Sequence, residues 1–383
     1  MTTFRVSGAR TAAAAALFTA LVLMMSFVAR SAVAAPVVVD GTPTVVGNAV
    51  TSCIGTASPY PTIQSGVSAA PAGSTVQVCP GNYPEQVTIA KALTLKGVSG
   101  TSDNSDAAVV TVPSTFTTGQ LTQVDIQASG VTLANIGVDG TNTLSSCGLV
   151  LVGILFDTGS SGTLKQVTLR NHNIPNPSGG YCGNGFPIYA TTAVNATVTD
   201  SSVRNFDGIG IDLTTSASVI VKTTTVAPVY VMSPLGSIPN CVYANAPTVQ
   251  VSSNTVGSCG TGVEVTTPAS GSGTVSNNTI VGWGTSSTGF GFLCFPSCYG
   301  ITVSGNQIFN TQAGAAMKTS GATGSIVFEN NSVNGTLKAF DLYGQPNNTV
   351  SNNTITDAAV GISGVAGNTV TGNTFKTVTV LTQ

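Results

Sequence analysis

The second half of the chain repeats a short polar and apolar pattern every 20 to 30 residues. Each clear copy places an asparagine before a Thr, Ser or Gln and then an apolar residue. These copies begin at Asn254, Asn278, Asn306, Asn331, Asn353 and Asn373, and three degenerate copies begin at His172, Ser201 and Thr224. A repeat of this length made of short strands predicts a solenoid with one coil per repeat.

The repeated asparagine is expected at a bend between two strands. Its side chain tolerates left-handed backbone geometry and bonds to the local backbone. Asparagines that stack from coil to coil can also pass amide hydrogen bonds along the solenoid. The pattern therefore predicts an architectural role for this column.

A second column runs in step with the first and consists of two apolar residues, one position apart, followed by a variable residue. Strand alternation predicts that the apolar members point into an elongated core: Phe156, Ile188, Ile211, Val242, Val263, Phe292, Met317, Phe340 and Ile362. The variable members then point outward, about 4.8 Å apart from coil to coil: Asp157, Tyr189, Asp212, Tyr243, Glu264, Leu293, Lys318, Asp341 and Ser363.

The first 34 residues have the layout of a secretory signal peptide. Arg5 and Arg10 lie before an apolar run at residues 12–29, and Ala32-Val33-Ala34 supplies a small-residue cleavage site. An uncleaved membrane anchor is the alternative. We expect residues 35–59 to be a lead segment and residues 60–383 to form one β-helix domain, exported to an extracellular or periplasmic location.

Composition supports one β-rich domain in the exported chain. Only 7% of residues are charged and 44 are glycine, which disfavours helices and favours strands and turns. Without the three arginines of the leader, 9 basic residues face 14 acidic ones, a net charge of about −5. Nucleic acid and anionic membranes are therefore not expected as partners.

The exported part contains an even number of cysteines, Cys53, Cys79, Cys147, Cys182, Cys241, Cys259, Cys294 and Cys298. Export favours disulfides over free thiols. Their clustering suggests that neighbours pair, 53 with 79, 147 with 182, 241 with 259 and 294 with 298. A zinc site is disfavoured because the spacing lacks a C-x2-C pair with a nearby histidine.

The stretch "YPTIQSGVSAAPAGSTVQVCPGNYPEQVTIAKALTLKGVSG", residues 60–100, resembles the N-terminal part of right-handed parallel β-helix proteins of the pectin-lyase-like superfamily. The resemblance implies an all-β solenoid in which a short helix, here near residues 62–70, caps the first coil. A strand-turn unit follows at residues 76–85, with Lys91 in the next turn. The resemblance extends over nearly all of the exported chain.

The superfamily includes pectate and pectin lyases, polygalacturonases and pectin methylesterases, together with non-catalytic surface and phage proteins. Residues 81–85 are similar to an early motif of pectin methylesterases. The later catalytic motifs of that family are absent here, as are the signatures of polygalacturonases. Fold resemblance alone therefore does not assign an activity.

The outward column is the candidate site for chemistry. Asp212 and Glu264 are expected two coils apart, which suits the acid and base of an inverting glycosidase. Alternatively, Asp157, Asp212 and Glu264 hold Ca²⁺ and Lys318 is the base of a β-elimination. Small residues two positions earlier, such as Gly210 and Gly262, would leave a shallow trough along this column.

Substrate contacts are expected from Tyr189, Tyr243, Asp341 and Trp283, whose rings and carboxylate suit sugars. The favoured function is binding of an extracellular polysaccharide along the outward column. The finer expectations are that this polysaccharide contains uronate and that the protein cleaves it. The alternatives are a structural or adhesive surface protein and a merely solvated sheet face. Strand-like sequence at the C-terminal end also predicts a covering loop or self-association through the last coil.

Overall fold

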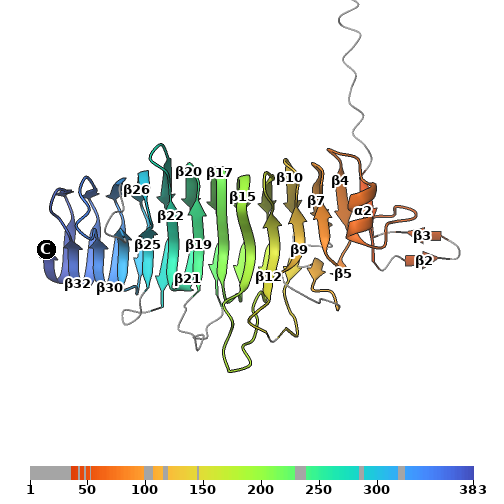
Figure 1. Ribbon diagram of the computed structural model, residues 1–383, viewed down its shortest axis with the longest axis horizontal. Helices are drawn as coiled ribbons and strands as arrows, with labels where there is room; N and C mark the ends of the chain where they lie inside the picture. The colour runs from red at the N-terminus through yellow and green to blue at the C-terminus, as the bar shows by residue number, and fades with distance from the viewer. Residues whose placement is uncertain are drawn as a thin grey trace, which may run out of the picture. The chain divides into compact units, whose positions relative to one another are not determined.

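The computed structural model describes residues 36–41, 44–46, 49–51, 53–98, 107–114, 120–144, 146–228, 239–283, 289–317 and 324–383. The expected signal peptide at residues 1–34 lies outside these residues, as does Lys318. In the unit from Pro36 to Gln383, the strands lie side by side as successive coils (Figure 1). No helix in the described part of the chain is long and apolar enough to span a bilayer.

The coils pair in parallel on three faces, which we call sheets 1, 2 and 3. Sheet 1 consists of β6 (Val87–Ile89), β9 (Gln120–Ile126), β12 (Val150–Phe156), the first parts of β15 (Gly185–Thr199) and β17 (Ile209–Lys222), β19 (Asn240–Asn245), β22 (Thr261–Thr266), β25 (Phe290–Cys294), β28 (Ala313–Met317), and the last parts of β30 (Ser332–Asp341), β32 (Thr354–Ser363) and β34 (Thr374–Thr382).

Sheet 2 consists of β1 (Val37–Val39), β4 (Thr75–Val78), β7 (Thr94–Gly97), β10 (Val131–Ala134), β13 (Ser161–Lys165), the last parts of β15 and β17, β20 (Thr248–Ser252), β23 (Ser272–Ser276), β26 (Cys298–Ser304), β29 (Gly324–Glu329), β31 (Thr349–Ser351) and β33 (Thr369–Thr371).

Sheet 3 consists of β5 (Gly81–Pro84), β8 (Ala108–Thr111), β11 (Gly137–Asp139), β14 (Thr168–Arg170), β16 (Ser202–Arg204), β18 (Thr225–Ala227), β21 (Thr255–Cys259), β24 (Thr279–Gly282), β27 (Gln307–Phe309) and the first parts of β30, β32 and β34. Each coil runs from sheet 2 to sheet 3 and then to sheet 1. Outside this network, β2 (Thr44–Val46) and β3 (Ala49–Thr51) form an antiparallel pair.

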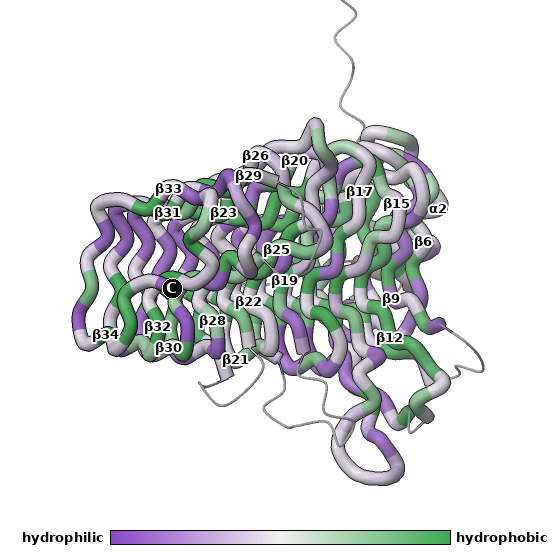
Figure 2. The backbone as a smooth tube through the Cα atoms, turned by 60° about the vertical axis from the view of Figure 1, so that its left-hand side comes forward, coloured by the Kyte–Doolittle hydropathy of each residue, from purple (hydrophilic) through white to green (hydrophobic). Residues whose placement is uncertain are grey.

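Apolar side chains of all three sheets fill the interior of the stack. Each of the expected inward residues is buried, and the rings of Phe292, Phe328 and Phe340 contact one another with centroids 5.9 and 5.5 Å apart. Hydrophobic and hydrophilic positions alternate along the chain and lie over one another from coil to coil (Figure 2). The sequence pattern therefore predicts the core correctly, because alternation along a strand decides which side chains face inward.

The expected asparagine ladder forms at the corner between sheets 2 and 3. Both the backbone N and Nδ2 of Asn254 donate to Oδ1 of Asn278, at 3.0 and 2.9 Å, and Nδ2 also donates to the Val221 carbonyl at 3.0 Å. The same bonds continue coil by coil through Asn306, Asn331, Asn353 and Asn373. Each buried amide is thus satisfied by the next coil.

The left-handed residue at this corner is the one before the ladder asparagine, which corrects the expectation. Ser253 and Asn277 have φ angles of 58° and 56°, and Gly305 and Gly372 take the same place in later coils. His172 is also not a member of the ladder. It follows β14 at the other end of sheet 3, is fully buried and bonds through Nε2 to Gln123 Oε1 at 2.9 Å.

Helix α2 (Ile63–Ala69) covers the first coil, as the resemblance implies. Thr62 caps its N-terminus by accepting from Ser65 N at 3.1 Å. Glu85 accepts from the backbone N of Ile63 and Gln64 at 2.7 and 2.8 Å, which satisfies two donors that a helix start leaves unpaired. Gly66 is needed where the helix meets Val39, because a Cβ there would lie 2.4 Å from a Val39 methyl carbon.

Four disulfides join the cysteines as neighbours along the chain, in the expected pairing. They link Cys53 with Cys79, Cys147 with Cys182, Cys241 with Cys259 and Cys294 with Cys298. Disulfides persist in oxidising compartments, so this set indicates an extracellular or equivalent environment.

Candidate functional site

One outward row of sheet 1 gathers the polar residues that the sequence singles out. Strand pairing aligns successive coils in the order Asp125, Leu155, Tyr189, Asp212, Tyr243, Glu264, Leu293, Ala316, Asp341 and Ser363. Tyr189, Asp212, Tyr243 and Glu264 occupy four consecutive coils, and we call them the Asp212 row. Leu155 and Leu293 bound this row on either side.

Alternation along each strand turns the Asp212 row outward. Ile211 and Leu213 flank Asp212 and are fully buried, and Val263 and Val265 hold Glu264 in the same way. Because neighbouring coils lie about 4.8 Å apart, the Cβ atoms of Asp212 and Glu264 are separated by about 9–10 Å, with Tyr243 between them.

The two carboxylates of the Asp212 row differ in their electrostatic setting. Burial raises the pKa of Asp212 to about 7, and the negative charge of Glu264 adds to this rise. The pKa of Tyr189 is raised by burial and then by the charge of Asp212. At neutral pH Asp212 therefore carries a proton in a large fraction of molecules.

A hollow of about 260 Å³ adjoins the Asp212 row and was not expected from the sequence. Phe186 and Asn240 line it, and the Phe186 ring contacts the Tyr189 ring at a centroid distance of 5.4 Å. Asn240 also lies against the row, with Nδ2 donating to Glu264 Oε2 at 3.4 Å. These residues precede the row by three positions on their strands, where no repeated sequence feature marks them.

Asp207 also lines this hollow. Its carboxylate accepts backbone hydrogen bonds from Ile174, Gly183 and Gly185 at 3.0, 3.1 and 2.6 Å. Burial raises the pKa of Asp207, and these three bonds oppose the rise. Asp207 therefore holds two chain segments together at the entry to sheet 1.

Two of the residues expected in the outward row of sheet 1, Asp157 and Lys318, are not at its aligned positions. Leu155, not Asp157, pairs with Tyr189, and Asp157 follows the end of β12. The error arises because Ile154, Leu155 and Phe156 are all apolar, so alternation does not reveal which one points outward. Ala316 takes the place expected for Lys318, which lies outside the described residues.

Asp341 lies at the expected position of the outward row but outside the Asp212 row. Leu293 and Ala316 separate it from Glu264. Its carboxylate bonds to Lys338 Nζ at 2.7 Å and accepts from Ser363 Oγ at 2.8 Å. Asp341 is therefore committed to a local network of the later coils.

Trp283 directly follows β24, at the end of sheet 3 and before the strand that carries Leu293. Its expected contact with a sugar stays a prediction, because the residues that follow it up to 288 are not described.

The expected trough of small residues is also corrected. Gly210, Gly262 and Gly291 face the core, since an added Cβ would lie 2.4–2.6 Å from Phe206, Ile280 and Ile308 respectively. At these three strands, two consecutive residues point inward, and glycine leaves room for the sheet 3 side chain opposite.

The three-carboxylate calcium set does not form, because Asp157 is outside the row. Within the described ranges, the cluster of potential metal ligands is Asp40 with Cys53 and Cys79. Those two sulfurs form a disulfide and offer no thiolate.

The coils, the three parallel sheets and the internal ladder define a β-helix solenoid. The sequence matches the model of the right-handed β-helix region over residues 152–324 and 238–375. Because these matches span more than half of the chain, the protein belongs to the right-handed β-helix family. Comparison with the curated proteins finds no match.

Solved structures with a similar fold include the lacto-N-biosidase from Eubacterium ramulus, with 10% identity and a TM-score of 0.45 over 90% of this chain and 65% of that chain. The pectin methylesterase from Aspergillus niger shares 13% identity, with a TM-score of 0.40 over 77% and 88%. The A-module of a mannuronan C-5 epimerase from Azotobacter vinelandii shares 14%, with a TM-score of 0.38 over 84% and 92%. The similarity is distant and concerns the fold alone.

Proposed function

We propose that the protein hydrolyses glycosidic bonds of an extracellular polysaccharide at the Asp212 row. The observation that supports this proposal is the placement of Asp212 and Glu264 on one outward row, two coils apart, with a tyrosine between them. Flexible side chains bring carboxyl groups at this Cβ separation into the roughly 6.5–9.5 Å range of inverting glycosidases.

Asp212 is the general acid in this proposal. Its raised pKa, about 7, keeps a proton available to the leaving glycosidic oxygen at neutral pH. Glu264 is the general base that activates a water molecule on the opposite face of the sugar. Asn240 orients Glu264 through its amide.

Tyr189 and Tyr243 provide ring faces on alternate coils, where successive sugars stack. The outward positions of this row carry two carboxylates and neither lysine nor arginine. A negatively charged sugar would be repelled there, so the bond cleaved lies between neutral sugars. This differs from the uronate-containing substrate that the sequence favours.

The chemistry of the row also argues against β-elimination. A lyase of the expected kind needs a calcium ion held by several carboxylates and a basic residue beside them. Asp157 lies outside the row, and the place expected for Lys318 belongs to Ala316. Of the two expected arrangements, the acid and base pair of Asp212 and Glu264 is the one that the row supports.

The test compares Asp212→Asn and Glu264→Gln with Asp125→Asn. Asp125 lies on the same outward row, three coils from Asp212, and serves as the matched control. New reducing ends are measured on a panel of neutral polysaccharides. We expect each of the first two variants to lose about 10²–10⁴-fold in kcat and the control to retain activity.

Three outcomes would contradict the proposal. Unsaturated products that absorb in the ultraviolet would indicate a lyase. Undiminished cleavage in Asp212→Asn would place catalysis elsewhere. Glycan binding that needs Tyr189 and Tyr243, without turnover in the wild type, would establish a non-catalytic binding protein.

A further inference from the structure

Three lysines, Lys96, Lys165 and Lys222, lie in one row along sheet 2, which we call the lysine row. Strand pairing aligns Lys96, Ala134, Lys165, Thr199 and Lys222 at one outward position of five consecutive coils. The lysines therefore recur on every second coil, about 9.5 Å apart. All three are exposed, and they form no ion pair within the described part of the chain.

Hydroxyl groups accompany the lysine row on the same face. Two residues earlier on the strands from β4 to β15, a second outward row holds threonines over five coils. These are Thr75, Thr94, Thr132, Thr163 and Thr197. On the coil of Lys222 this position belongs to Ile220. A ligand that lies along the axis would therefore meet a hydroxyl on each coil from β4 to β15 and an ammonium group on every second coil from Lys96 to Lys222.

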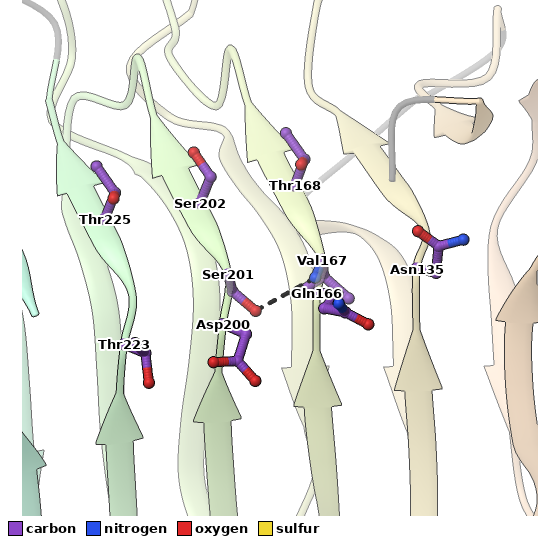
Figure 3. A pocket seen from close by; sticks show the side chains of 9 residues that line it. All are labelled: Asn135, Gln166, Val167, Thr168, Asp200, Ser201, Ser202, Thr223 and Thr225. Carbon is purple, nitrogen blue, oxygen red and sulfur yellow. Dashed lines mark hydrogen bonds between the residues drawn. The ribbon is translucent and has the colours of Figure 1, made fainter. Parts of the chain in front are cut away.

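A polar hollow of about 440 Å³ borders the lysine row on the side of sheet 3. It is formed by the corner residues directly after the row, Gln166, Asp200 and Thr223, together with Thr168, Ser202 and Thr225 on sheet 3. Figure 3 shows the three hydroxyl side chains at one level on neighbouring strands and the corner side chains at another. The hollow thus offers hydrogen bonds rather than an apolar lining.

Charge is distributed unevenly over the molecule. Of the 9 basic residues after the leader, five lie on sheets 2 and 3 between β7 and β17: the three lysines, Arg170 and Arg204. Among the described residues, the nearby acidic side chains are Asp139, which bonds to Arg170 at 2.8 Å, and Asp200 in the hollow. The lysine row therefore keeps a net positive charge on a protein that is acidic as a whole.

We propose that the lysine row and its hollow bind a linear anionic polysaccharide. In an extended 1,4-linked chain, alternate sugars turn to opposite sides, so equivalent carboxylates or sulfates recur once per disaccharide. A spacing of two coils is comparable with that repeat, and the threonines and hollow residues face the hydroxyl groups between the charges.

Nucleic acid fits this surface poorly. A nucleic acid strand carries a phosphate about every 3.4 Å, much denser than the lysines, and the described row has no aromatic rings on which bases could stack. A polymer with sparse, regular charge matches better.

This surface goes beyond the proposed hydrolysis, because it uses different residues on a different sheet. It would anchor the protein on an acidic matrix while the Asp212 row acts on neutral sugars. Each function can be lost without the other.

The test measures binding of polygalacturonate and of the same polymer with its carboxylates fully methyl-esterified, by isothermal titration calorimetry. The variant K96Q/K165Q/K222Q removes the row's charge, and K96R/K165R/K222R preserves it. Lys376→Gln is the matched control, an exposed lysine of the last coil on sheet 3. Circular dichroism checks that each variant is folded.

We expect wild-type protein to bind polygalacturonate and not the esterified polymer. The triple glutamine variant should bind about tenfold more weakly. The slope of log K against log salt concentration should fall by about 2, since each lysine contributes about 0.7. The triple arginine variant, Lys376→Gln and Asp212→Asn should bind like the wild type.

Equal binding of both polymers, or an unchanged affinity in the triple glutamine variant, would overturn this inference. Tighter binding of single-stranded DNA than of polygalacturonate would also overturn it. Loss of cleavage in Asp212→Asn with binding intact would leave both proposals standing. Absence of cleavage in the wild type, with lysine-dependent binding, would remove the proposed hydrolysis alone.

Discussion

The Asp212 row on sheet 1 and the lysine row on sheet 2 are built by the same stacking and carry opposite chemistry. In both rows the charged residues occur on alternate coils, with Tyr243 between two carboxylates and Ala134 or Thr199 between two lysines. Like charges on directly adjacent strands would repel each other at about 4.8 Å. An alternating arrangement keeps a row charged and the stack intact.

The two rows differ in burial, and this difference decides what each can do. Asp212 is partly buried, and its pKa is raised to about 7, so it can exchange a proton near neutral pH. The lysines are exposed, so their attraction for a partner is screened by salt. Burial therefore suits the first row to catalysis, and exposure suits the second to reversible binding.

The largest expected effect separates the two rows directly. On a neutral polysaccharide, the double variant D212N/E264Q should lose about 10²–10⁴-fold in kcat, because the proton donor and the base are both gone. The variant K96Q/K165Q/K222Q should keep the wild-type kcat. Initial rates of reducing-end formation measure both. A matching loss in the lysine variant would show that the rows are not independent.

The pH dependence of cleavage should distinguish Asp212 as an acid. Because only protonated Asp212 can donate, the rate should fall about tenfold per pH unit above pH 7. Affinity for polygalacturonate should change little between pH 6 and 8, since lysines keep their charge there. Rates and affinities measured across this range check both. A rate that rises steadily with pH would exclude Asp212 as the acid.

Breaking the asparagine ladder should affect both rows together. In Asn278→Ala, the Asn254 backbone N and the Val251 carbonyl each lose a buried partner. We expect a loss of about 1–3 kcal/mol in the free energy of unfolding. Urea denaturation measures this loss, with the outward-facing Thr279→Ala as the control on the next strand. Equal stability of the two variants would contradict a stabilising ladder.

The smallest effect concerns the coupling within the Asp212 row. In Glu264→Gln the negative charge two coils away disappears, so the pKa of Asp212 should decrease. It should stay above the ordinary value of an aspartate, because burial is the larger cause of the rise. Carbon-13 NMR of the labelled carboxyl group follows this titration. A pKa that does not move would show that the two carboxylates do not interact.

The repeat period, the inward apolar residues and the ladder could all be predicted from the sequence, because each depends on local alternation and on one residue type at each bend. The register of the outward row could be predicted only in part. Alternation identifies Tyr189, Asp212, Tyr243 and Glu264 correctly, whereas an unbroken apolar run misplaces Asp157. The fold class and the core residues of this chain can therefore be predicted from local sequence patterns.

Neither the hollow beside the Asp212 row nor the lysine row could be predicted from local sequence patterns. Lys96, Lys165 and Lys222 lie 57 or more residues apart and follow no common spacing, because the connecting loops differ in length. By itself the sequence determined that coils form and which side chains fill them, since strand alternation and the bend residues are local. Only the stacked structure decided which distant polar residues become neighbours, since strand pairing removes the effect of loop length and sets one coil directly over the next.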